Sequence, residues 1–274
     1  DVSPVCDDTS GLFLGTVTVL RDITELKRVE EVKAQFVNMI AHELRAPLAA
    51  VDGFLSVLSE GLVKDPEQEK HMLQRCRERI RALAELVSDL LDMARMEAGR
   101  VRREIMPQKL SDIISVVVEL MAPVAQQHGV TLTTQVPDDL RSVDADREEL
   151  IRLFNNLVSN AIKYNRPGGT VTITAAEDGA YVKVAVADTG VGISEEGLKR
   201  LFTEFFREKR PETREISGTG LGLSIVKRIV DFYHGRLDVQ SKIGEGSTFT
   251  VWLPFSTSVP SSVSAATGES REGQ

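Results

Sequence analysis

Two long segments near the N-terminal end each carry a single apolar stripe, and this pattern restricts the possible folds more than any other feature. From residue 66 to residue 98, apolar residues alternate at spacings of four and three, which is the heptad pattern of a helix that packs along one seam. The seam residues are Cys76, Ile80, Leu83, Val87, Leu90 and Ala94. The stripe before it consists of Val29, Val32, Phe36, Met39, Leu48, Val51, Leu55, Leu58 and Leu62.

Turn and capping residues delimit the two helices. Asp22 is placed to cap the first helix, with Glu25 completing a capping box, and Gly61 to end it. Asp65 precedes Pro66, the favoured residue at a first helical position. Residues 25–98 therefore predict a helical hairpin. Two helices alone leave much of the stripe exposed, so we expect two hairpins to pair as a four-helix bundle in a homodimer. The alternative, a seam within one larger helical domain, requires further matching helices, which the rest of the chain does not supply.

From residue 100 the pattern changes to a mixture of strands and helices, which predicts an α+β sandwich with helices on one face of a sheet. The expected helices are 110–128, 146–164 and 221–234, and the expected strands are 130–136, 170–176, 180–187, 236–241 and 247–253. The charged residues 207–217 predict a mobile loop. The tail 256–274, rich in Ser, Thr and Gly, is expected to be disordered. An earlier strand is expected at residues 11–20.

Composition excludes several classes of function. The net charge is −8, and no local basic face is visible, so we expect no nucleic-acid partner. Two isolated cysteines, Cys6 and Cys76, indicate neither a disulfide framework nor a zinc site. The longest apolar run, residues 12–20, is too short to span a bilayer. The isolated cysteines also fit a reducing cytoplasm, where we expect this fragment to lie without direct membrane contact. The chain begins at Asp1 rather than Met, so we interpret it as a fragment, and any membrane anchor would lie upstream.

The first chemical motif is FVNMIAHELRAPL, residues 36–48. At about 100° per residue, His42 lies about 200° from both Ile40 and Leu44, so it should point away from the seam. Pro47 removes a helical hydrogen bond and locally weakens the helix. An exposed histidine beside Glu43 is a plausible nucleophile, with the carboxylate accepting the Nδ1 proton. Taken alone, such a pair is more often a solvated surface feature.

The second motif, NNLVSNAIKY, lies at residues 155–164 of an expected helix. Spacings of four and three place Asn156, Asn160 and Lys163 on one face. An amide oxygen suits Mg²⁺, and a lysine ammonium suits phosphate. The alternative is a polar face that simply contacts solvent.

Two glycine-containing motifs follow. Asp188 ends an alternating strand and precedes Gly190 and Gly192, so its carboxylate could accept from an exocyclic amino group while bare backbone approaches a flat base. Residues 218–223, GTGLGL, lead into an expected helix, where amides and the helix N-terminus favour an anion. Each motif alone is also consistent with an ordinary turn.

Read together and in this order, the motifs resemble those of the sensor histidine kinases. HELRAPL resembles the family's H box, NNLVSNAIKYN its N box, DTGVGI its first glycine box, LFTEFFR its F box and GTGLGLSIVK its second glycine box, and residues 244–249 resemble its closing strand. The resemblance covers roughly residues 29–254. Residues 11–26 also resemble the end of a PAS sensor domain. The domains implied are 1–24 (end of a PAS-like domain), 25–99 (dimerisation and phosphotransfer), 100–255 (ATP-binding, of the Bergerat or GHKL type) and 256–274 (tail).

The resemblance implies a role for each motif residue. His42 would be the phosphoacceptor, Glu43 its base, and Asn160 the principal Mg²⁺ ligand, supported by Asn156. The remaining residues would bind ATP. Lys163 and Arg207 would contact its phosphates, Tyr164 and Thr248 would contact the nucleotide, and Asp188 would bind the adenine together with Gly190 and Gly192. The lid over the nucleotide would consist of Gly218, Thr219, Gly220, Leu221 and Gly222. A receiver domain of a response regulator would then accept the phosphoryl group.

Two other functions are weighed against this one. Related ATPases of the gyrase and mismatch-repair group carry a water-activating Glu four residues before the Mg²⁺ Asn, where this chain has Asn156, which cannot act as a base. A catalytically inactive dimeric scaffold is the other alternative, but the motif residues with a direct chemical role are present. One departure concerns Ala46, which stands where the family often has Thr or Asn. It makes no side-chain hydrogen bond, so we expect weak phosphatase activity.

Overall fold

The computed structural model divides into two compact units, Asp1–Leu83 and Ala84–Gln274. The division falls inside a long helix, so the end of that helix belongs to the second unit. The described residues are 2–6, 13–18, 22–97, 103–208, 210–214, 216 and 218–256. The predicted disordered tail lies outside them, apart from Ser256.

The first unit begins with a two-stranded antiparallel hairpin. Its strands are β1 (Val2–Cys6) and β2 (Phe13–Thr18), and Val2 pairs with Thr18. The strand expected at residues 11–20 is therefore found at β2, and its remaining positions lie outside the described residues.

The helix α1 spans Thr24–Ser59. Asp22 Oδ1 accepts a hydrogen bond of 2.9 Å from the amide of Thr24, the first residue of the helix. The N-cap position is Ile23, one residue after the predicted Asp22, and its side chain makes no capping hydrogen bond. The side chain of Glu25, the other half of the predicted capping box, lies outside the described residues. Pro47 stands inside the helix, and Gly61 has a φ of +66° just beyond its end. The left-handed conformation at this glycine reverses the chain at little steric cost.

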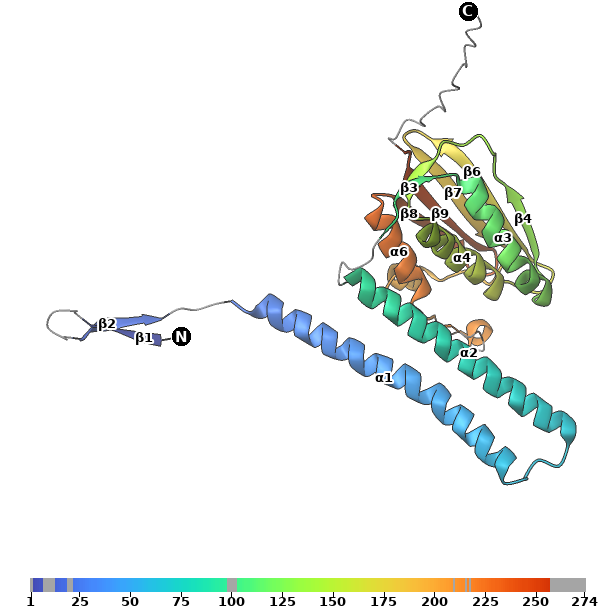
Figure 1. The fold of residues 1–274 in the computed structure, drawn as a ribbon, viewed down its shortest axis with the longest axis horizontal. Helices are drawn as coiled ribbons and strands as arrows, with labels where there is room; N and C mark the ends of the chain where they lie inside the picture. The colour runs from blue at the N-terminus through green and yellow to red at the C-terminus, as the bar shows by residue number, and fades with distance from the viewer. Residues whose placement is uncertain are drawn as a thin grey trace, which may run out of the picture. The chain divides into compact units, whose positions relative to one another are not determined.

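The helix α2 spans Pro66–Glu97, and Asp65 Oδ1 accepts a hydrogen bond of 3.1 Å from the amide of Glu67. The predicted cap at Asp65 is thus confirmed. Within the first unit, α1 and the beginning of α2 run antiparallel, which confirms the predicted hairpin (Figure 1).

The apolar stripes of the hairpin are only partly covered within one chain. On α2, Cys76 is buried, whereas Ile80 is 54% exposed and Val87 is 43% exposed. The last predicted seam position, Ala94, is exposed, and its neighbour Met93 is buried instead. Exposed apolar residues on and beyond α1 include Leu48, Leu55 and Leu62. The hairpin therefore leaves apolar surface that a second hairpin could cover.

The second unit contains a five-stranded sheet in the order β4-β6-β7-β9-β8. Strand β4 is parallel to β6, and the other neighbours are antiparallel. The strands are β4 (Thr131–Gln135), β6 (Thr170–Asp178), β7 (Tyr181–Asp188), β8 (Arg236–Lys242) and β9 (Gly246–Pro254). A separate antiparallel pair joins β3 (Met106–Gln108) to β5 (Val143–Ala145).

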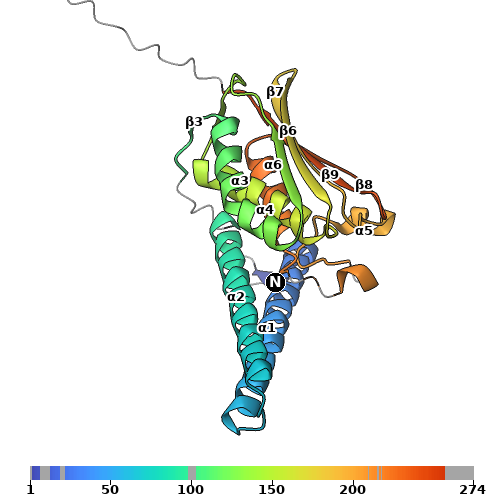
Figure 2. The ribbon, with the colours of Figure 1, turned by 90° about the vertical axis from the view of Figure 1, so that its right-hand side faces the viewer.

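Three helices cover one face of this sheet, which confirms the predicted α+β sandwich (Figure 2). They are α3 (Leu110–Gln127), α4 (Arg147–Lys163) and α6 (Gly222–Phe232). The central helix α4 packs against both α3 and α6 and against strands of the sheet. Burial of this apolar layer is the main source of the unit's stability.

The helix α3 is long and apolar enough to cross a membrane by length and composition. In the second unit it packs against α4 and β4 instead. Its residues Leu110, Ile113 and Val117 are each at most 1% exposed. We therefore interpret α3 as a covering helix of the sandwich.

Several short elements were not expected from the sequence. The strands β3 and β5 have three residues each, and α5 (Glu195–Arg200) has six, too few for periodicity to be visible. The predicted loop 207–217 contains one short 3₁₀ helix, η1 (Pro211–Thr213).

A buried polar cluster joins the segment before β3 to the sandwich. The Nε of Arg103 donates to both carboxylate oxygens of Glu149 at 2.9 Å, and the Tyr233 hydroxyl donates to Glu149 Oε2 at 2.6 Å. The same hydroxyl accepts from the amide of Asp146 at 3.0 Å. Burial, followed by the hydrogen bond to Glu149, raises the pKa of the Tyr233 hydroxyl above its usual value. The neutral phenol is therefore the form that the fold favours.

We predict that Tyr233→Phe lowers the free energy of unfolding by about 1–3 kcal/mol, because a buried carboxylate and a backbone amide lose a partner. Since the folded-state pKa of Tyr233 is raised, its contribution is complete below the ordinary tyrosine pKa of about 10 and is lost as the pH rises above it. Urea denaturation at neutral and alkaline pH measures both effects. The matched control is Tyr181→Phe, since no hydrogen bond of this hydroxyl is found among the described residues. Equal losses for the two variants would contradict the prediction.

Candidate functional site

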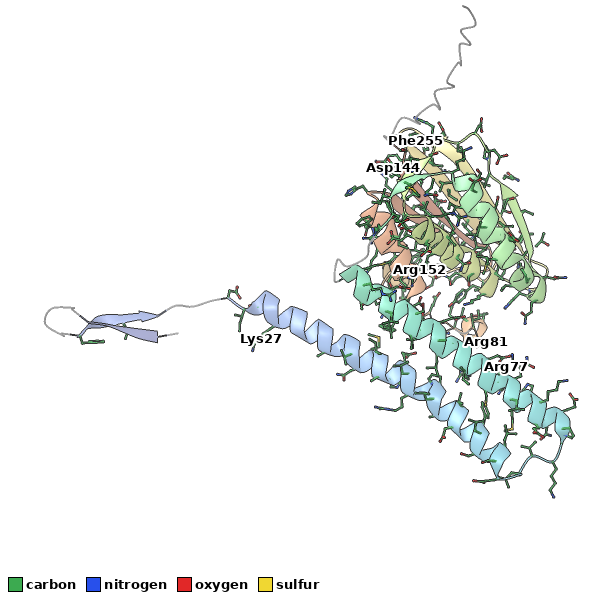
Figure 3. The ribbon with its side chains drawn as sticks, in the orientation of Figure 1. Lys27, Arg77, Arg81, Asp144, Arg152 and Phe255 are labelled. Atoms are coloured by element: carbon green, nitrogen blue, oxygen red, sulfur yellow. The ribbon has the colours of Figure 1, made fainter. Side chains whose placement is uncertain are left out.

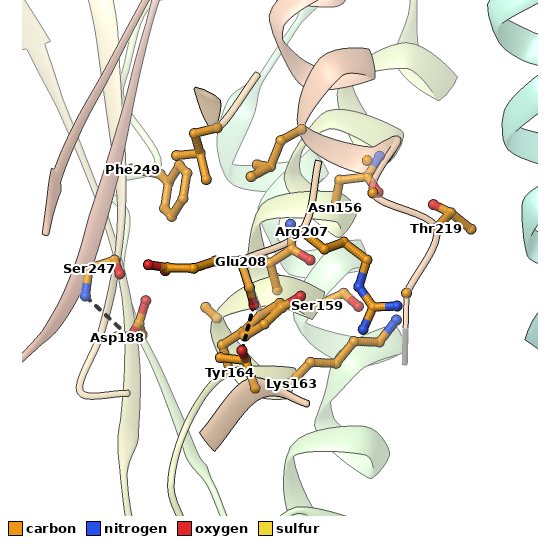
Figure 4. A pocket seen from close by; sticks show the side chains of 18 of the residues that line it. Asn156, Ser159, Lys163, Tyr164, Asp188, Arg207, Glu208, Thr219, Ser247 and Phe249 are labelled. Atoms are coloured by element: carbon orange, nitrogen blue, oxygen red, sulfur yellow. Dashed lines mark hydrogen bonds between the residues drawn. The ribbon is translucent and has the colours of Figure 1, made fainter. Parts of the chain in front are cut away.

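A cavity of about 650 Å³ opens in the second unit between α4, the end of β7, the start of β9 and the loop before α6. Figure 4 shows Asp188, Ser247 and Phe249 at one end of the cavity and Lys163, Arg207 and Thr219 toward the other. A cavity of this size is sufficient for a ligand as large as a nucleotide.

The phase of α4 directs its polar residues into this cavity. Asp146 caps the helix by accepting from the amides of Glu148 at 2.9 Å and Glu149 at 3.2 Å. The buried face of α4 consists of Leu150, Leu153, Phe154, Leu157, Val158, Ala161 and Ile162. The opposite face carries Asn156, Asn160 and Lys163, which all line the cavity. The prediction that these three residues share one face is confirmed.

Asp188 lies at one end of the cavity, as the last residue of β7. Its Oδ1 accepts from the amide of Gly190 at 2.8 Å and from the amide of Ser247 at 3.3 Å. Burial raises the pKa of the Asp188 carboxyl, and the two hydrogen bonds only partly oppose this effect. The carboxylate is held in place by backbone donors, and both of these bonds use the same oxygen.

Close backbone contacts explain the glycines around Asp188. A Cβ at Gly190 would lie 2.3 Å from the carbonyl oxygen of Tyr164, and one at Gly246 would lie 2.0 Å from the carbonyl oxygen of Asp188. At Gly192, where φ is +66°, a Cβ would lie 2.0 Å from the carbonyl oxygen of Lys242. Any side chain would therefore push apart the segments that form this end of the cavity.

The glycine-rich loop meets the middle of α4 at Asn156. A Cβ at Gly222 would lie 2.8 Å from Asn156 Oδ1, and one at Gly220 would lie 2.8 Å from Phe205 Cα. Arg207 reaches across this loop and donates a hydrogen bond to the carbonyl of Ile216. The loop thus brings unhindered backbone amides and an arginine to the end of the cavity that contains Lys163.

Most of the residues predicted for the nucleotide site gather around this one cavity. Those that line it are Asn156, Asn160, Lys163, Tyr164, Asp188, Gly192, Arg207, Gly218, Thr219, Gly220 and Gly222. Gly190, Leu221 and Thr248 do not line it. Leu221 is fully buried in the core, while Gly190 acts through its hydrogen bond to Asp188.

The assignment of Thr248 is corrected by the alternation of β9. Successive side chains of a strand point to opposite faces, and Ser247 and Phe249 line the cavity. Thr248 therefore lies on the other face of the sheet. The motif indicated the right strand but not which of its faces meets the cavity, and alternation could have identified Ser247. Other lining residues that were not predicted include Ser159, Val191, Ile193, Leu201, Phe206 and Arg210.

His42 lies on α1 in the first unit, and its side chain is 79% exposed. Ile40 and Leu44 are less exposed, as the predicted helical phase requires. The Nδ1 atom of His42 lies 3.8 Å from Glu43 Oε1, which is longer than a hydrogen bond. The histidine is therefore accessible, and its neighbouring carboxylate is close enough to reach Nδ1 after a small rotation.

Among the described residues, no group of three or more His, Cys, Asp or Glu side chains could hold a metal ion. Asn156 and Asn160 on the cavity wall offer amide oxygens, which are hard ligands of the kind that Mg²⁺ accepts. A Mg²⁺ ion fits these residues only if a ligand such as a phosphate and water supply the rest of its coordination shell.

Two family models match the chain. Residues 32–99 match the His Kinase A (phospho-acceptor) domain, and residues 145–257 match the histidine kinase-, DNA gyrase B- and HSP90-like ATPase. The first match contains His42, and the second contains most of the cavity. No match to a PAS domain was found.

Curated relatives share this combination. The chain is 31% identical over 268 residues to an uncharacterized sensor-like histidine kinase of Rhizobium meliloti, with 92% of the chain and 51% of the relative covered. It is 32% identical over 243 residues to the sensor protein SrrB of Staphylococcus aureus, with 88% of the chain and 41% of the relative covered. The chain thus spans about half the length of such relatives or less.

Solved structures agree with the fold. The histidine kinase ThkA, in complex with the response regulator protein TrrA, has a TM-score of 0.66 at 25% identity over 93% of this chain and 74% of that one. Full-length ShkA in complex with AMPPNP has a TM-score of 0.59 at 30% identity over 82% of this chain and 46% of that one. With a phosphoacceptor domain followed by an ATP-binding domain, the chain belongs to the sensor histidine kinases of two-component systems.

Proposed function

We propose that this chain transfers the γ-phosphoryl group of ATP to its own His42 and then passes it to an aspartate of a response regulator. The observation that carries the proposal is the arrangement of one cavity, with a buried carboxylate at one end and cations with bare glycine amides at the other. A nucleotide has the matching polarity, because its base offers an amino group and its other end carries negative charge.

At the base end, we assign Asp188 to the adenine. Its Oδ1 takes both backbone hydrogen bonds, so Oδ2 is the oxygen directed to an exocyclic amino group. Val191, Ile193 and Phe249 supply apolar contacts to a flat ring. The close backbone approach at Gly192 supports the assignment, since it fixes this lining segment directly against the backbone of Lys242.

At the phosphate end, Lys163 and Arg207 neutralise charge, and the amides of the glycine-rich loop donate to oxygens. Asn160, with Asn156, would hold a Mg²⁺ ion whose charge offsets that of the phosphates when the ion is bound. Phosphoryl transfer requires mainly positioning and charge neutralisation, and these residue types provide both.

The transfer step has His42 as its nucleophile. The Nε2 atom forms a bond to the γ-phosphorus while the bond to the bridging oxygen breaks, and ADP leaves with that electron pair. The proton on Nδ1 passes to Glu43, which lies 3.8 Å away. In the second transfer, a carboxylate oxygen of the regulator takes the phosphoryl group from Nε2. The solved ThkA complex with its regulator supports a receiver domain as this chain's partner.

Hydrolysis of ATP by water is the competing function. It requires a general base near the γ-phosphate, and the cavity presents the amide Asn156 one turn before Asn160. An amide cannot accept the proton of an attacking water. The identity of this residue therefore favours His42 as the acceptor.

The remaining proposals concern the domain bounds, the location and the oligomeric state of the chain. We propose phosphotransfer and ATP-binding domains at residues 25–99 and 100–255, with a cytoplasmic location for both. The exposed apolar stripe of the hairpin supports a homodimer through residues 25–98. A PAS-like origin for residues 1–24 stays a prediction, and no match to a PAS domain supports it.

Incubation with radiolabelled ATP and Mg²⁺ tests the phosphoacceptor. We expect an acid-labile, base-stable label that is absent in His42→Ala, because no other residue has the assigned role. His71 is an exposed histidine on α2, so His71→Ala is the matched control and should keep full labelling. Labelling that survives in His42→Ala would contradict the assignment.

Substitution of Gly192 tests the base end of the cavity. Gly192→Ala should abolish detectable ATP binding in a calorimetric titration, since the new Cβ would meet Lys242 O at 2.0 Å. The control, Gly179→Ala, has a similar φ of +60° but open space around its Cβ. In both variants an alanine must adopt the left-handed backbone conformation, which costs about 1–2 kcal/mol. A difference in ATP affinity between the two variants therefore reports the clash. Unchanged binding in Gly192→Ala would be inconsistent with this geometry.

Ala46 provides a test of the reverse reaction. Ala46→Thr should accelerate the decay of a phosphorylated receiver domain by about tenfold or more, because a hydroxyl one turn after His42 can position water. The substrate is a receiver domain that the phosphorylated chain labels, and the decay is followed with ADP present. Ala34→Thr makes the same change at an exposed site two turns before His42 and should have no effect. A wild-type chain that already dephosphorylates strongly would refute the expectation.

A further inference from the structure

Arg152 of α4, which is labelled in Figure 3, is paired with two carboxylates from the end of α2. This end of α2 belongs to the second unit. The Nη2 of Arg152 lies 3.2 Å from Asp89 Oδ1, and its Nη1 pairs with Asp92 Oδ2. The three side chains are only 20–24% exposed. Partly buried pairs of this kind are less screened by salt than surface pairs.

The second oxygen of Asp89 contacts the glycine-rich loop. Thr219 donates a hydrogen bond of 2.9 Å from its Oγ1 to Asp89 Oδ2, and the same Oγ1 accepts from the amide of Leu221 at 3.2 Å. Asp89 therefore joins α4 to the loop through one carboxylate. We call Asp89, Asp92, Arg152 and Thr219 the acidic clasp.

Both partners of these carboxylates belong to the proposed phosphate end. Arg152 lies one turn before Asn156 on α4, on the same face as Asn160 and Lys163. Thr219 stands between Gly218 and Gly220, and all three residues line the cavity. The clasp thus occupies a cation and a hydroxyl that an anionic ligand would otherwise attract.

The lining of the cavity carries charges of both signs. Lys163 and Arg207 line it, and so do Asp89 and Asp92 of α2. Phosphates that approach Arg152 and Thr219 meet these two carboxylates, and like charges at close range repel each other. Phosphates therefore compete with Asp89 and Asp92 for Arg152 and for the Thr219 hydroxyl.

We propose that the acidic clasp is an electrostatic latch, in which Asp89 and Asp92 hold Arg152 and the glycine-rich loop until the phosphates of a nucleotide displace them. The proposal rests on the nucleotide site proposed above. The proposal means that nucleotide binding weakens the contacts of Asp89 and Asp92 with the ATP-binding domain. By thermodynamic linkage, these contacts weaken nucleotide binding by the same factor. Asp89 and Asp92 would then control when the domain is free to deliver its phosphoryl group.

The alternative explanation is that the acidic clasp has a purely structural role, and this explanation makes a different prediction. In that role the clasp would stabilise the glycine-rich loop in the conformation that binds nucleotide, so its removal should weaken the binding of every ligand. A latch competes only with phosphate, so its removal should tighten binding of phosphorylated ligands and leave a neutral nucleoside unaffected.

The test is a calorimetric titration of the whole chain with ATP, ADP and adenosine. The double variant Asp89→Asn, Asp92→Asn keeps the side-chain shapes and the acceptor for Thr219 but removes both charges. We expect it to bind ATP and ADP at least about fivefold more tightly than the wild type, the lower end of typical coupling between sites. Adenosine affinity should be unchanged.

The matched control is Asp138→Asn, Asp139→Asn, at two exposed acidic positions in the connection after β4. It changes the net charge by the same amount and should leave all three affinities unchanged. If the clasp variant unfolds, as shown by its melting curve, the single variant Asp89→Asn provides the comparison.

Three results would overturn the latch. They are unchanged or weaker ATP binding in the clasp variant, an equal gain for adenosine, and an equal gain in the control. Failure of the nucleotide site gives a different result, because neither the wild type nor the clasp variant would then bind ATP, and Asp188→Asn would make no difference.

Discussion

The burial of one face of α4 beneath the sheet determines the direction of the polar residues in the site. Leu153, Phe154 and Leu157 are each at most 1% exposed, so this helix cannot rotate without exposing a large apolar surface. Because the apolar face of α4 is fixed in this way, its opposite face is turned toward the cavity. That face carries Asn156, Asn160 and Lys163. The site is therefore oriented by hydrophobic packing, while its chemistry is supplied by residues that contribute little to that packing.

Backbone contacts, rather than side chains, give the other end of the cavity its shape. Asp188 is positioned by amides of Gly190 and Ser247, and the chain at Gly246 passes so close to Asp188 that no Cβ fits between them. Such an arrangement keeps a charged group in a fixed place with little solvent. The raised pKa of the Asp188 carboxyl is the electrostatic consequence of this burial.

Periodicity and capping residues were sufficient to predict the long elements. The heptad pattern predicted the helix α2, and Asp65 before Pro66 predicted where it begins. The alternation of apolar and polar residues predicted the central strands of the sheet. Three-residue strands such as β3 have no period to detect. The motif around β9 did not distinguish Thr248 from Ser247, because the face of a strand depends on its register within the sheet. The pairing of Arg152 with Asp89 joins residues 63 apart in the sequence, so no local pattern could reveal it.

The two units bury their apolar residues by different means, and this difference bears on how the chain works. The sandwich closes its own core, since Phe154, Ile173 and Val251 are fully buried within one chain. The hairpin does not, because Ile80 on α2 and Leu55 on α1 stay about half exposed. If two hairpins pair as proposed, the stability of the hairpin depends on protein concentration, whereas that of the sandwich does not. The sandwich is thus complete within one chain, while the proposed phosphoacceptor His42 is carried on a hairpin whose apolar surface would be completed by the proposed dimer.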